Sequence, residues 1–482
     1  MRLRMIFRIM GALIFFLGLT MVFPLFFSLY YRDGDLWALI LSAAITTGTG
    51  AFLFLIFRGT TEEIFHREGF AIVALGWASV AFFGSLPYML AGVLPSFVEA
   101  YFEATSGFTT TGATVLAAIE EVPRGILFWR SLTHWLGGMG IIVLSIAILP
   151  FLGVGGMQLF RAEVPGGRVA DKLKPRIAET AKILWQVYML ISAAETLLLM
   201  TGGMSLFEAL CHTFGTMATG GFSTRNVSIG SYNKAYFDGI IVVFMILAGT
   251  NFSLHYQALT GNFRAFYRNS ELRFYWATLA GAMLLVTLIL RVQVYETLLT
   301  AFRYASFQVT SIMTTTGYTT ADFEKWPSFV QYTLVVLMFI GGSAGSTGGG
   351  MKCMRILLLL KQGRRELSRL IHPHGVIPVR LGGKVVSDGV IQSVWGFFFL
   401  FILVFILASV GMSLLGLDII TAFVSVAATI NNIGPGLGAV GPMDNYTSIP
   451  LIGKWILIFC MLIGRLELYT IIVLLVPEFW KR

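Results

Sequence analysis

The chain contains a series of apolar stretches that are long enough to cross a lipid bilayer. A transmembrane helix needs about 20 mostly apolar residues. Such stretches lie at 8–30, 37–57, 70–93, 132–153, 183–202, 238–258, 274–292, 328–360 (interrupted), 391–415 and 452–477. Only 12% of the 482 residues are charged, whereas a soluble domain carries about 25%. We therefore expect an all-α membrane protein with about ten transmembrane helices.

Positive charge gathers in alternate linking segments. The segments 161–182, 264–273 and 352–384 are rich in Lys and Arg, whereas 94–131 and 418–451 carry few positive charges and several acids. Positive loops stay in the cytoplasm, so both termini are expected on the cytoplasmic side. The net charge of +9 is explained by these loops, and no nucleic-acid partner is expected.

Four of the outward-facing segments contain a short apolar stretch that is followed by a Thr/Gly cluster. They read FEATSGFTTTGAT (102–114), HTFGTMATGGFST (212–224), VTSIMTTTGYTT (309–320) and VAATINNIGPGLG (426–438). Alignment on Gly112, Gly220, Gly317 and Gly434 gives a period of roughly one hundred residues, which is too long for a solenoid. The period suits a unit of helix, half-helix, loop and helix.

This pattern matches the chemistry of cation conduction. Rings of backbone carbonyls can replace the water around a cation, and glycine permits the unusual dihedrals that aim consecutive carbonyls at one axis. The C-terminal end of each half-helix carries partial negative charge, which favours cations. A single Thr-Gly pair is more often a turn, but four copies in register favour one pore built from four loops.

The repeat divides the chain into five parts. We expect an N-terminal two-helix segment at 1–68, and four pore repeats at 69–176, 177–270, 271–385 and 386–482, the third with a basic cytoplasmic loop. The fold class is thus four pseudo-fourfold repeats of outer helix, pore loop and inner helix around one pore, plus two extra N-terminal helices.

A second layer of pore-lining residues is predicted below the loops, because the helix after each loop contains a glycine break. Alignment of the four breaks places Gly138, Gly249, Gly342 and Arg465 in one column. A charge at mid-membrane is costly and marks a functional site by default, so Arg465 is expected to face the pore as an electrostatic constriction, with pairing to another helix as its alternative. Glu467 is two residues away on another helix face and is expected to pair elsewhere.

The break in the third repeat, at residues 341–350, is unusually rich in glycine. Each glycine in a helix costs about 1 kcal/mol relative to alanine, so we expect a broken helix and a mobile gate loop; close helix packing through small residues is the alternative. The expected gate residues besides Arg465 are Gly341, Gly342, Ser343, Ala344, Gly345, Ser346, Thr347, Gly348, Gly349, Gly350 and Lys352.

The four loops, the glycine run and the segment Gly464-Arg465-Leu466-Glu467 resemble the TrkH/TrkG-type potassium uptake subunits of the Trk/Ktr/HKT superfamily. The resemblance covers nearly the whole chain. It implies that potassium would be bound by filter carbonyls of Thr110, Thr111, Gly112, Ala218, Thr219, Gly220, Thr315, Thr316, Gly317, Asn432, Ile433 and Gly434. Glycine rather than serine at position 112 implies a preference for potassium over sodium. Ala218 and the Asn432-Ile433 pair depart from Thr-Thr, which predicts an asymmetric filter.

The resemblance also implies partners and a location. It implies a homodimer with one pore per subunit in a bacterial inner membrane, and a cytoplasmic nucleotide-binding ring similar to TrkA as gating partner. The basic segments 161–182 and 361–384 are candidate docking surfaces. No covalent cofactor is expected, and the ion in the pore would be K+.

Other classes of protein fit less well. An alternating-access transporter would show a twofold or inverted repeat, and a membrane enzyme would show a catalytic motif such as HExxH or Gly-x-Ser-x-Gly; neither is present, so no enzyme is expected. A sodium-permeable member of the same family, or a potassium symporter coupled to H+ or Na+, remains open.

Overall fold

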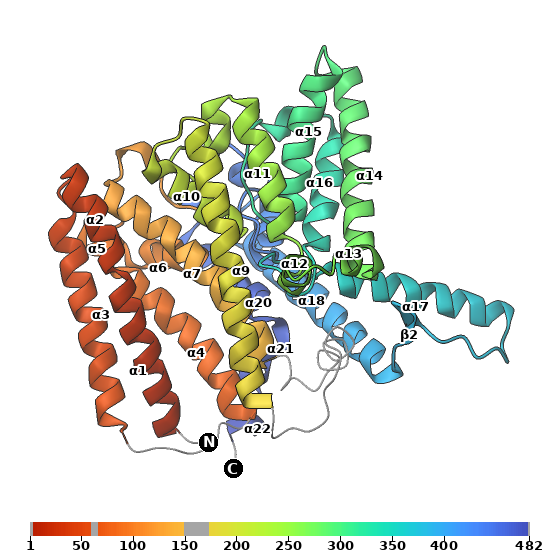
Figure 1. The fold of residues 1–482 in the computed structure, drawn as a ribbon, viewed down its shortest axis with the longest axis horizontal. Coiled ribbons are helices and arrows are strands. Elements are labelled where there is room, and N and C mark those ends of the chain that lie inside the picture. The colour runs from red at the N-terminus through yellow and green to blue at the C-terminus, as the bar shows by residue number, and fades with distance from the viewer. Residues whose placement is uncertain (1–2, 59–65, 149–172, 481–482) are drawn as a thin grey trace.

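The computed structural model describes residues 3–58, 66–148 and 173–480, and its regular structure is almost entirely helical (Figure 1). Three helices come first: α1 (Leu3–Thr20), α2 (Val22–Tyr31) and α3 (Leu36–Ile56). α1 and α3 lie side by side along much of their length. They approach closely because a Cβ on Gly50 would collide with the backbone of Phe15, the use of small residues that is typical of helix pairs in membranes.

Four units of similar construction follow, each with an outer helix, a short buried helix, a loop and an inner helix. The outer helices are α4 (His66–Gly84), α9 (Leu173–Thr201), α14 (Ser270–Gln293) and α18 (Asp388–Leu414). The short buried helices are α6 (Phe97–Phe108), α10 (Leu206–Met217), α15 (Leu298–Met313) and α19 (Ile419–Ile430). The inner helices are α7 (Arg124–Ile148), α11 (Ala235–Ala248) with α12 (Phe252–Leu259), α16 (Ser328–Ile340) with α17 (Cys353–Ile371), and α20 (Leu451–Leu466) with α21 (Leu468–Leu475). The predicted fold class is confirmed.

Within the ranges that the structure describes, the remaining elements are short connections. They are α5 (Leu86–Leu90), α13 (Arg264–Arg268), α22 (Pro477–Trp480), five 3-10 helices at Ile119–Glu121, Ser228–Tyr232, Phe323–Lys325, Gly438–Val440 and Tyr446–Ser448, and an antiparallel hairpin of β1 (Arg380–Leu381) and β2 (Lys384–Val385). α17 extends away from the helical bundle (Figure 1). The predicted basic segment 161–182 lies largely outside the described residues.

Among the described residues, six helices are long and apolar enough to cross a membrane, or eight if each bent pair counts as one span. The six are Leu3–Tyr31, Leu36–Ile56, Arg67–Leu90, Glu179–Thr201, Ser270–Gln293 and Asp388–Leu414. The predicted stretch 132–153 runs beyond the described residues, and α16 is shorter than a full span. The number ten therefore stays a prediction.

Burial separates the outer helices from the short ones. On α18, Phe399 and Leu407 are 65% and 62% exposed, which suits a lipid-facing surface. By contrast, every residue of Val424–Ile430 on α19 is buried. The later parts of the other three short helices are buried as well, so these parts form the core of the four units.

The inner helices do not all break at glycine. The pair α11–α12 bends by 100° and the pair α20–α21 by 120°, and twelve residues, 341–352, separate the end of α16 from the start of α17. The break predicted at Gly138 is wrong, because α7 runs through it without interruption. Its glycines serve close packing instead: a Cβ on Gly137 would collide with the backbone of Phe108.

The two ends of the described chain meet at one end of the bundle. Ile6 and Met10 of α1 pack in one cluster with Phe479 of α22, and α1 and α22 converge there in Figure 1. Both ends of the described chain therefore lie at the same end of the helical bundle.

Candidate ion pathway

The four loops that follow the short helices share one unusual backbone conformation. A residue with positive φ comes first, and a glycine with positive φ follows two positions later. The pairs are Thr110 and Gly112, Thr219 and Gly221, Thr315 and Gly317, and Asn432 and Gly434. Positive φ is uncommon outside glycine, so its fourfold recurrence at one spacing identifies equivalent loops, which we number 1 to 4 in chain order.

The residue between each pair is fixed by the same hydrogen bond. Its backbone N–H donates to the carbonyl five residues earlier, over 2.9 Å in loop 1 and 2.8 Å in loops 2, 3 and 4. The four donors are Thr111, Gly220, Thr316 and Ile433, and their acceptors are Ser106, Gly215, Ser311 and Ala428. Each loop is therefore pinned to the last turn of its own short helix.

The structure shifts the alignment of loop 2 by one residue. Gly221, and not Gly220, takes the position of the other positive-φ glycines, so the equivalent trio is Thr219, Gly220 and Gly221. Ala218 lies one residue earlier, as the C-cap of α10. Alignment by sequence could not decide between two adjacent glycines. Whether any of these residues binds an ion stays a prediction.

The loops interlock in a closed ring. A Cβ on Gly112 would collide with the carbonyl oxygen of Gly220, and one on Gly221 with that of Thr316. The same relation joins Gly317 to the Ile433 carbonyl and Gly434 to the Thr111 carbonyl. The glycine of each loop thus faces the middle carbonyl of the next, and loop 4 returns to loop 1. Four carbonyls of one position are brought together around one centre.

Side-chain hydroxyls and one amide brace this ring. The hydroxyls of Thr109 and Thr111 are 2.8 Å apart, as are those of Thr314 and Thr316. In loop 4, Asn432 Nδ2 donates to Thr111 Oγ1 and to the Met461 carbonyl, each over 3.0 Å. The predicted departure of loop 4 from Thr-Thr thus has a structural counterpart, a side-chain bridge from loop 4 to loop 1.

A buried ion pair lies behind loops 1 and 2. Arg130 Nε donates to Glu103 Oε1 over 2.7 Å, and both side chains are at most 2% exposed. Glu103 also accepts from the backbone N–H of Val115 over 2.9 Å, and Arg130 donates to the Ser223 carbonyl over 2.9 Å. Sequence reasoning missed this pair. Its visible signal is Glu103 within the apolar stretch of α6, since a buried charge needs a partner.

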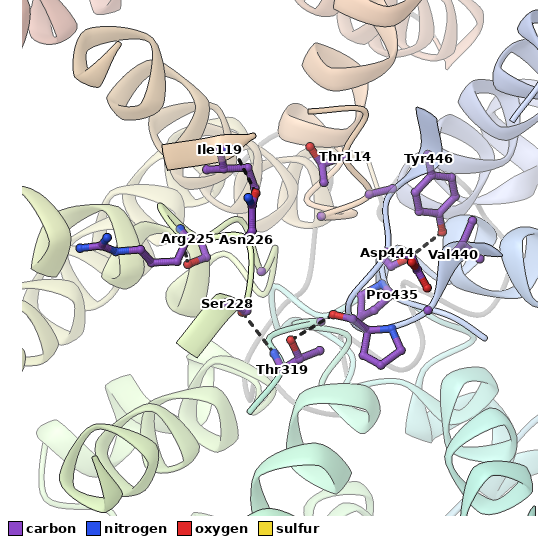
Figure 2. A pocket seen from close by; sticks show the side chains of 18 of the residues that line it. Thr114, Ile119, Arg225, Asn226, Ser228, Thr319, Pro435, Val440, Asp444 and Tyr446 are labelled. Carbon is purple, nitrogen blue, oxygen red and sulfur yellow. Dashed lines mark hydrogen bonds between the residues drawn. The ribbon is translucent and has the colours of Figure 1, made fainter. Parts of the chain in front are cut away.

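Outside the ring, the four units surround a pocket (Figure 2). It is lined by residues from each loop and from the segments after them: Gly112, Ala113, Thr114, Ile119, Arg130, Gly221, Ser223, Arg225, Asn226, Ser228, Gly317, Thr319, Gly434, Pro435, Val440, Gly441, Pro442, Asp444 and Tyr446. The pocket thus opens directly onto the four positive-φ glycines.

On the other side of the ring, Arg465 joins two units. Its Nη1 donates to the Thr347 carbonyl over 2.7 Å and its Nη2 to the Gly137 carbonyl over 3.1 Å, and the side chain is buried. It has no carboxylate partner among the described residues. Glu467 instead pairs with Arg355 over 2.6 Å, so the expectation that Glu467 pairs outside its own helix is confirmed.

The break between α16 and α17 is filled by a non-helical segment, residues 341–352, that packs beneath the ring. Thr347 Oγ1 donates to the Met217 carbonyl over 2.9 Å. The Gly349 N–H donates to Thr315 Oγ1 over 2.6 Å, and the Gly350 N–H to the Asn431 carbonyl over 3.1 Å. The segment therefore touches the ends of three short helices. The helix break predicted from the glycine run is present, and its mobility stays a prediction.

Two charged groups hold the ends of this segment. Glu271 Oε1 accepts from the N–H groups of Ala344 and Met354 over 2.6 and 3.1 Å. Lys352 Nζ donates to the Gly348 carbonyl. Among the described residues no group of three or more His, Cys, Asp or Glu could hold a metal ion.

These features define a polytopic membrane protein in which four loops meet around one axis. The chain belongs to the TrkH family, described as cation transport proteins, whose family model matches residues 41–482. It is 46% identical to the Trk system potassium uptake protein TrkH of Halomonas elongata and 44% identical to that of Escherichia coli K12, with 100% of both chains covered in each case. The crystal structure of the potassium transporter TrkH from Vibrio parahaemolyticus matches all of this chain with a TM-score of 0.92 and 40% identity.

Proposed function

We propose that this protein takes up potassium across a bacterial inner membrane through one gated pore, with both termini in the cytoplasm. The observation that carries the proposal is the closed ring, in which the carbonyls of Thr111, Gly220, Thr316 and Ile433 face the glycines of neighbouring loops. Carbonyl rings of this kind replace the hydration shell of potassium. Relatives that match the whole chain are named potassium uptake proteins, which supports potassium as the ion.

The ring forms the selectivity filter in this proposal. The C-terminal ends of α6, α10, α15 and α19 lead directly into the four loops, and these ends carry partial negative charge that favours a cation. The filter residues are the predicted twelve, with Gly221 in place of Ala218 in loop 2. The glycine at position 112 favours potassium over sodium, by resemblance to the family.

The gate lies immediately inside the filter. Arg465 places a fixed positive charge beneath the ring, and the segment 341–352 fills the space below loops 2, 3 and 4 through Thr347, Gly349 and Gly350. A positive charge at a constriction raises the barrier for a cation. Opening would require the segment to leave the ring and Arg465 to release the Thr347 carbonyl.

The proposal includes partners. A homodimer and a TrkA-like cytoplasmic nucleotide-binding ring follow from the family resemblance. α17 extends from the bundle and carries exposed Arg364 and Arg369, which offers a basic docking surface continuous with the gate segment. Movement of α17 would pull on Lys352 and the segment before it.

Reversal potentials of purified protein in liposomes test the proposal. With K+ on one side and Na+ on the other, a potassium-selective filter gives a large reversal potential, whose sign is the one that the K+ gradient sets. A potential near zero supports a sodium-permeable pore instead. A shift caused by an added proton gradient supports a coupled symporter, and absence of any K+ current would contradict the proposed function.

A further inference from the structure

Tyr446 holds one of the four filter glycines by its carbonyl. Its hydroxyl donates to the Gly434 carbonyl over 2.6 Å (Figure 2). Within the described residues, the carbonyls of Gly112, Gly221 and Gly317 accept no such hydrogen bond. The filter is therefore asymmetric at this level for a reason that lies outside the loop sequences, in a residue twelve positions after Gly434.

Tyr446 is held in place by a backbone hydrogen bond and by ring packing. Its backbone N–H donates to the Thr114 carbonyl over 2.8 Å, and its ring packs on Phe102 of α6 with the ring centres 5.6 Å apart. The side chain is 2% exposed. Because the backbone is attached to loop 1 and the hydroxyl to loop 4, Tyr446 fixes the outer end of one loop against the other.

Loop 4, like loop 2 with Ala218 and Gly220, lacks an internal pair of hydroxyls. Loops 1 and 3 each contain a threonine pair with hydroxyls 2.8 Å apart. The corresponding residues of loop 4 are Asn431 and Ile433, and isoleucine offers no hydroxyl. Besides its bonds to its own short helix, loop 4 is held to loop 1 through the side chain of Asn432 and is held at its outer end by the hydroxyl of Tyr446.

We propose that Tyr446 is a positioning residue for ion selectivity, whose hydroxyl fixes the Gly434 peptide and so the geometry of the outer filter. This rests on the proposed function. A carbonyl oxygen has two lone pairs, so the Gly434 carbonyl can accept from the phenol and keep one lone pair for another partner. Loss of the hydroxyl frees the peptide to rotate, and a looser set of oxygens discriminates less between ions that differ in size and field strength.

Tyr446→Phe removes one oxygen and keeps the ring on Phe102. In liposomes under K+/Na+ bi-ionic conditions, we expect the Na+ to K+ permeability ratio to rise several-fold. Tyr101→Phe is the matched control, because it deletes a phenol that donates to the Ala78 carbonyl over 3.3 Å on the outer side of α6. The control is expected to keep the wild-type ratio.

An unchanged ratio in a folded, conducting Tyr446→Phe protein would overturn the proposal, as would an equal change in Tyr101→Phe. If Tyr446→Phe does not fold, Phe102→Leu replaces it. In that variant the tyrosine keeps its hydroxyl but loses the aromatic ring on which it packs. An unchanged permeability ratio in Phe102→Leu overturns the proposal. Failure of the proposed function is distinguishable, because the wild-type protein itself would then show no selective K+ current.

Discussion

Arg465 donates to the Thr347 carbonyl over 2.7 Å, and this bond joins the bend after loop 4 to the broken segment after loop 3. The two residues are 118 positions apart in the chain. The same guanidinium reaches the Gly137 carbonyl of α7, so one side chain from the fourth unit contacts the first and the third.

Arg465→Ala is expected to raise K+ flux in reconstituted vesicles several-fold. The substitution removes the positive charge below the ring and releases the Thr347 carbonyl. It also removes two hydrogen bonds to backbone carbonyls, and a net hydrogen bond is worth about 1 kcal/mol, so the thermal stability should fall slightly. Arg291→Ala, an exposed arginine near the end of α14, is the control; flux equal to the control would refute an electrostatic constriction.

Deletion of residues 344–348 is expected to increase the open probability in single-channel records. It removes Thr347, which donates to the Met217 carbonyl, and shortens the segment that fills the space below the ring. Ion selectivity should stay as in wild type because the loops are untouched. Records with wild-type open probability from a folded deletion protein would argue against this segment as a gate.

Gly112→Ser is expected to weaken the rejection of sodium. Gly112 has a φ of 79°, which side chains rarely adopt, and a Cβ there would meet the Gly220 carbonyl oxygen. Loops 1 and 2 must therefore separate, and the carbonyl spacing changes. Competition of Na+ against Rb+ uptake measures the effect, with Gly92→Ser, a glycine in open space, as control. Identical ion preference in both variants would count against the filter assignment.

Uptake at limiting K+ is expected to fall at acidic pH because of Glu324. This carboxylate accepts from the Gly438 N–H over 2.6 Å and lies beside Gly441 at the outer pocket. Burial raises its pKa, and the nearby charges of Asp322 and Asp444 act in the same direction, against the Gly438 hydrogen bond. Glu324 therefore takes up a proton at a higher pH than an ordinary glutamate as the medium is acidified, and the entrance loses negative charge. At every pH, Glu324→Gln should show the reduced uptake that the wild-type protein shows at acidic pH. A wild-type pH profile in that variant would contradict the assignment.

The sequence predicted the broad design well where local chemistry determines it. The Thr/Gly clusters located all four loops, and the glycine run located the break after Ile340, because no helix tolerates so many glycines. Prediction from the sequence failed where the local backbone conformation depends on contacts with another part of the chain. Gly137 and Gly138 remain helical because they pack against other backbone, and loop 2 has adjacent glycines whose register is set by the bond from Gly220 to Gly215.

The residues that brace the loops were harder to predict, because they are distant in the chain. Tyr446 begins a 3-10 helix that recurs in units 1 and 3, where Ile119 and Phe323 take its position and offer no hydroxyl. Arg130 is separated from Ser223 by 93 positions. Glu467 was expected to pair elsewhere, but its partner Arg355 is identifiable only once α17 is placed beside α18, which packs on α20.

The most direct test of a single cation pore is the anomalous scattering of rubidium in crystals of this protein, since Rb+ substitutes for K+. We expect a peak on the axis between the carbonyls of Thr111, Gly220, Thr316 and Ile433, and none at the level of Arg465. Absence of a peak at the ring in crystals grown in Rb+, or a peak that lies outside it, would contradict the account.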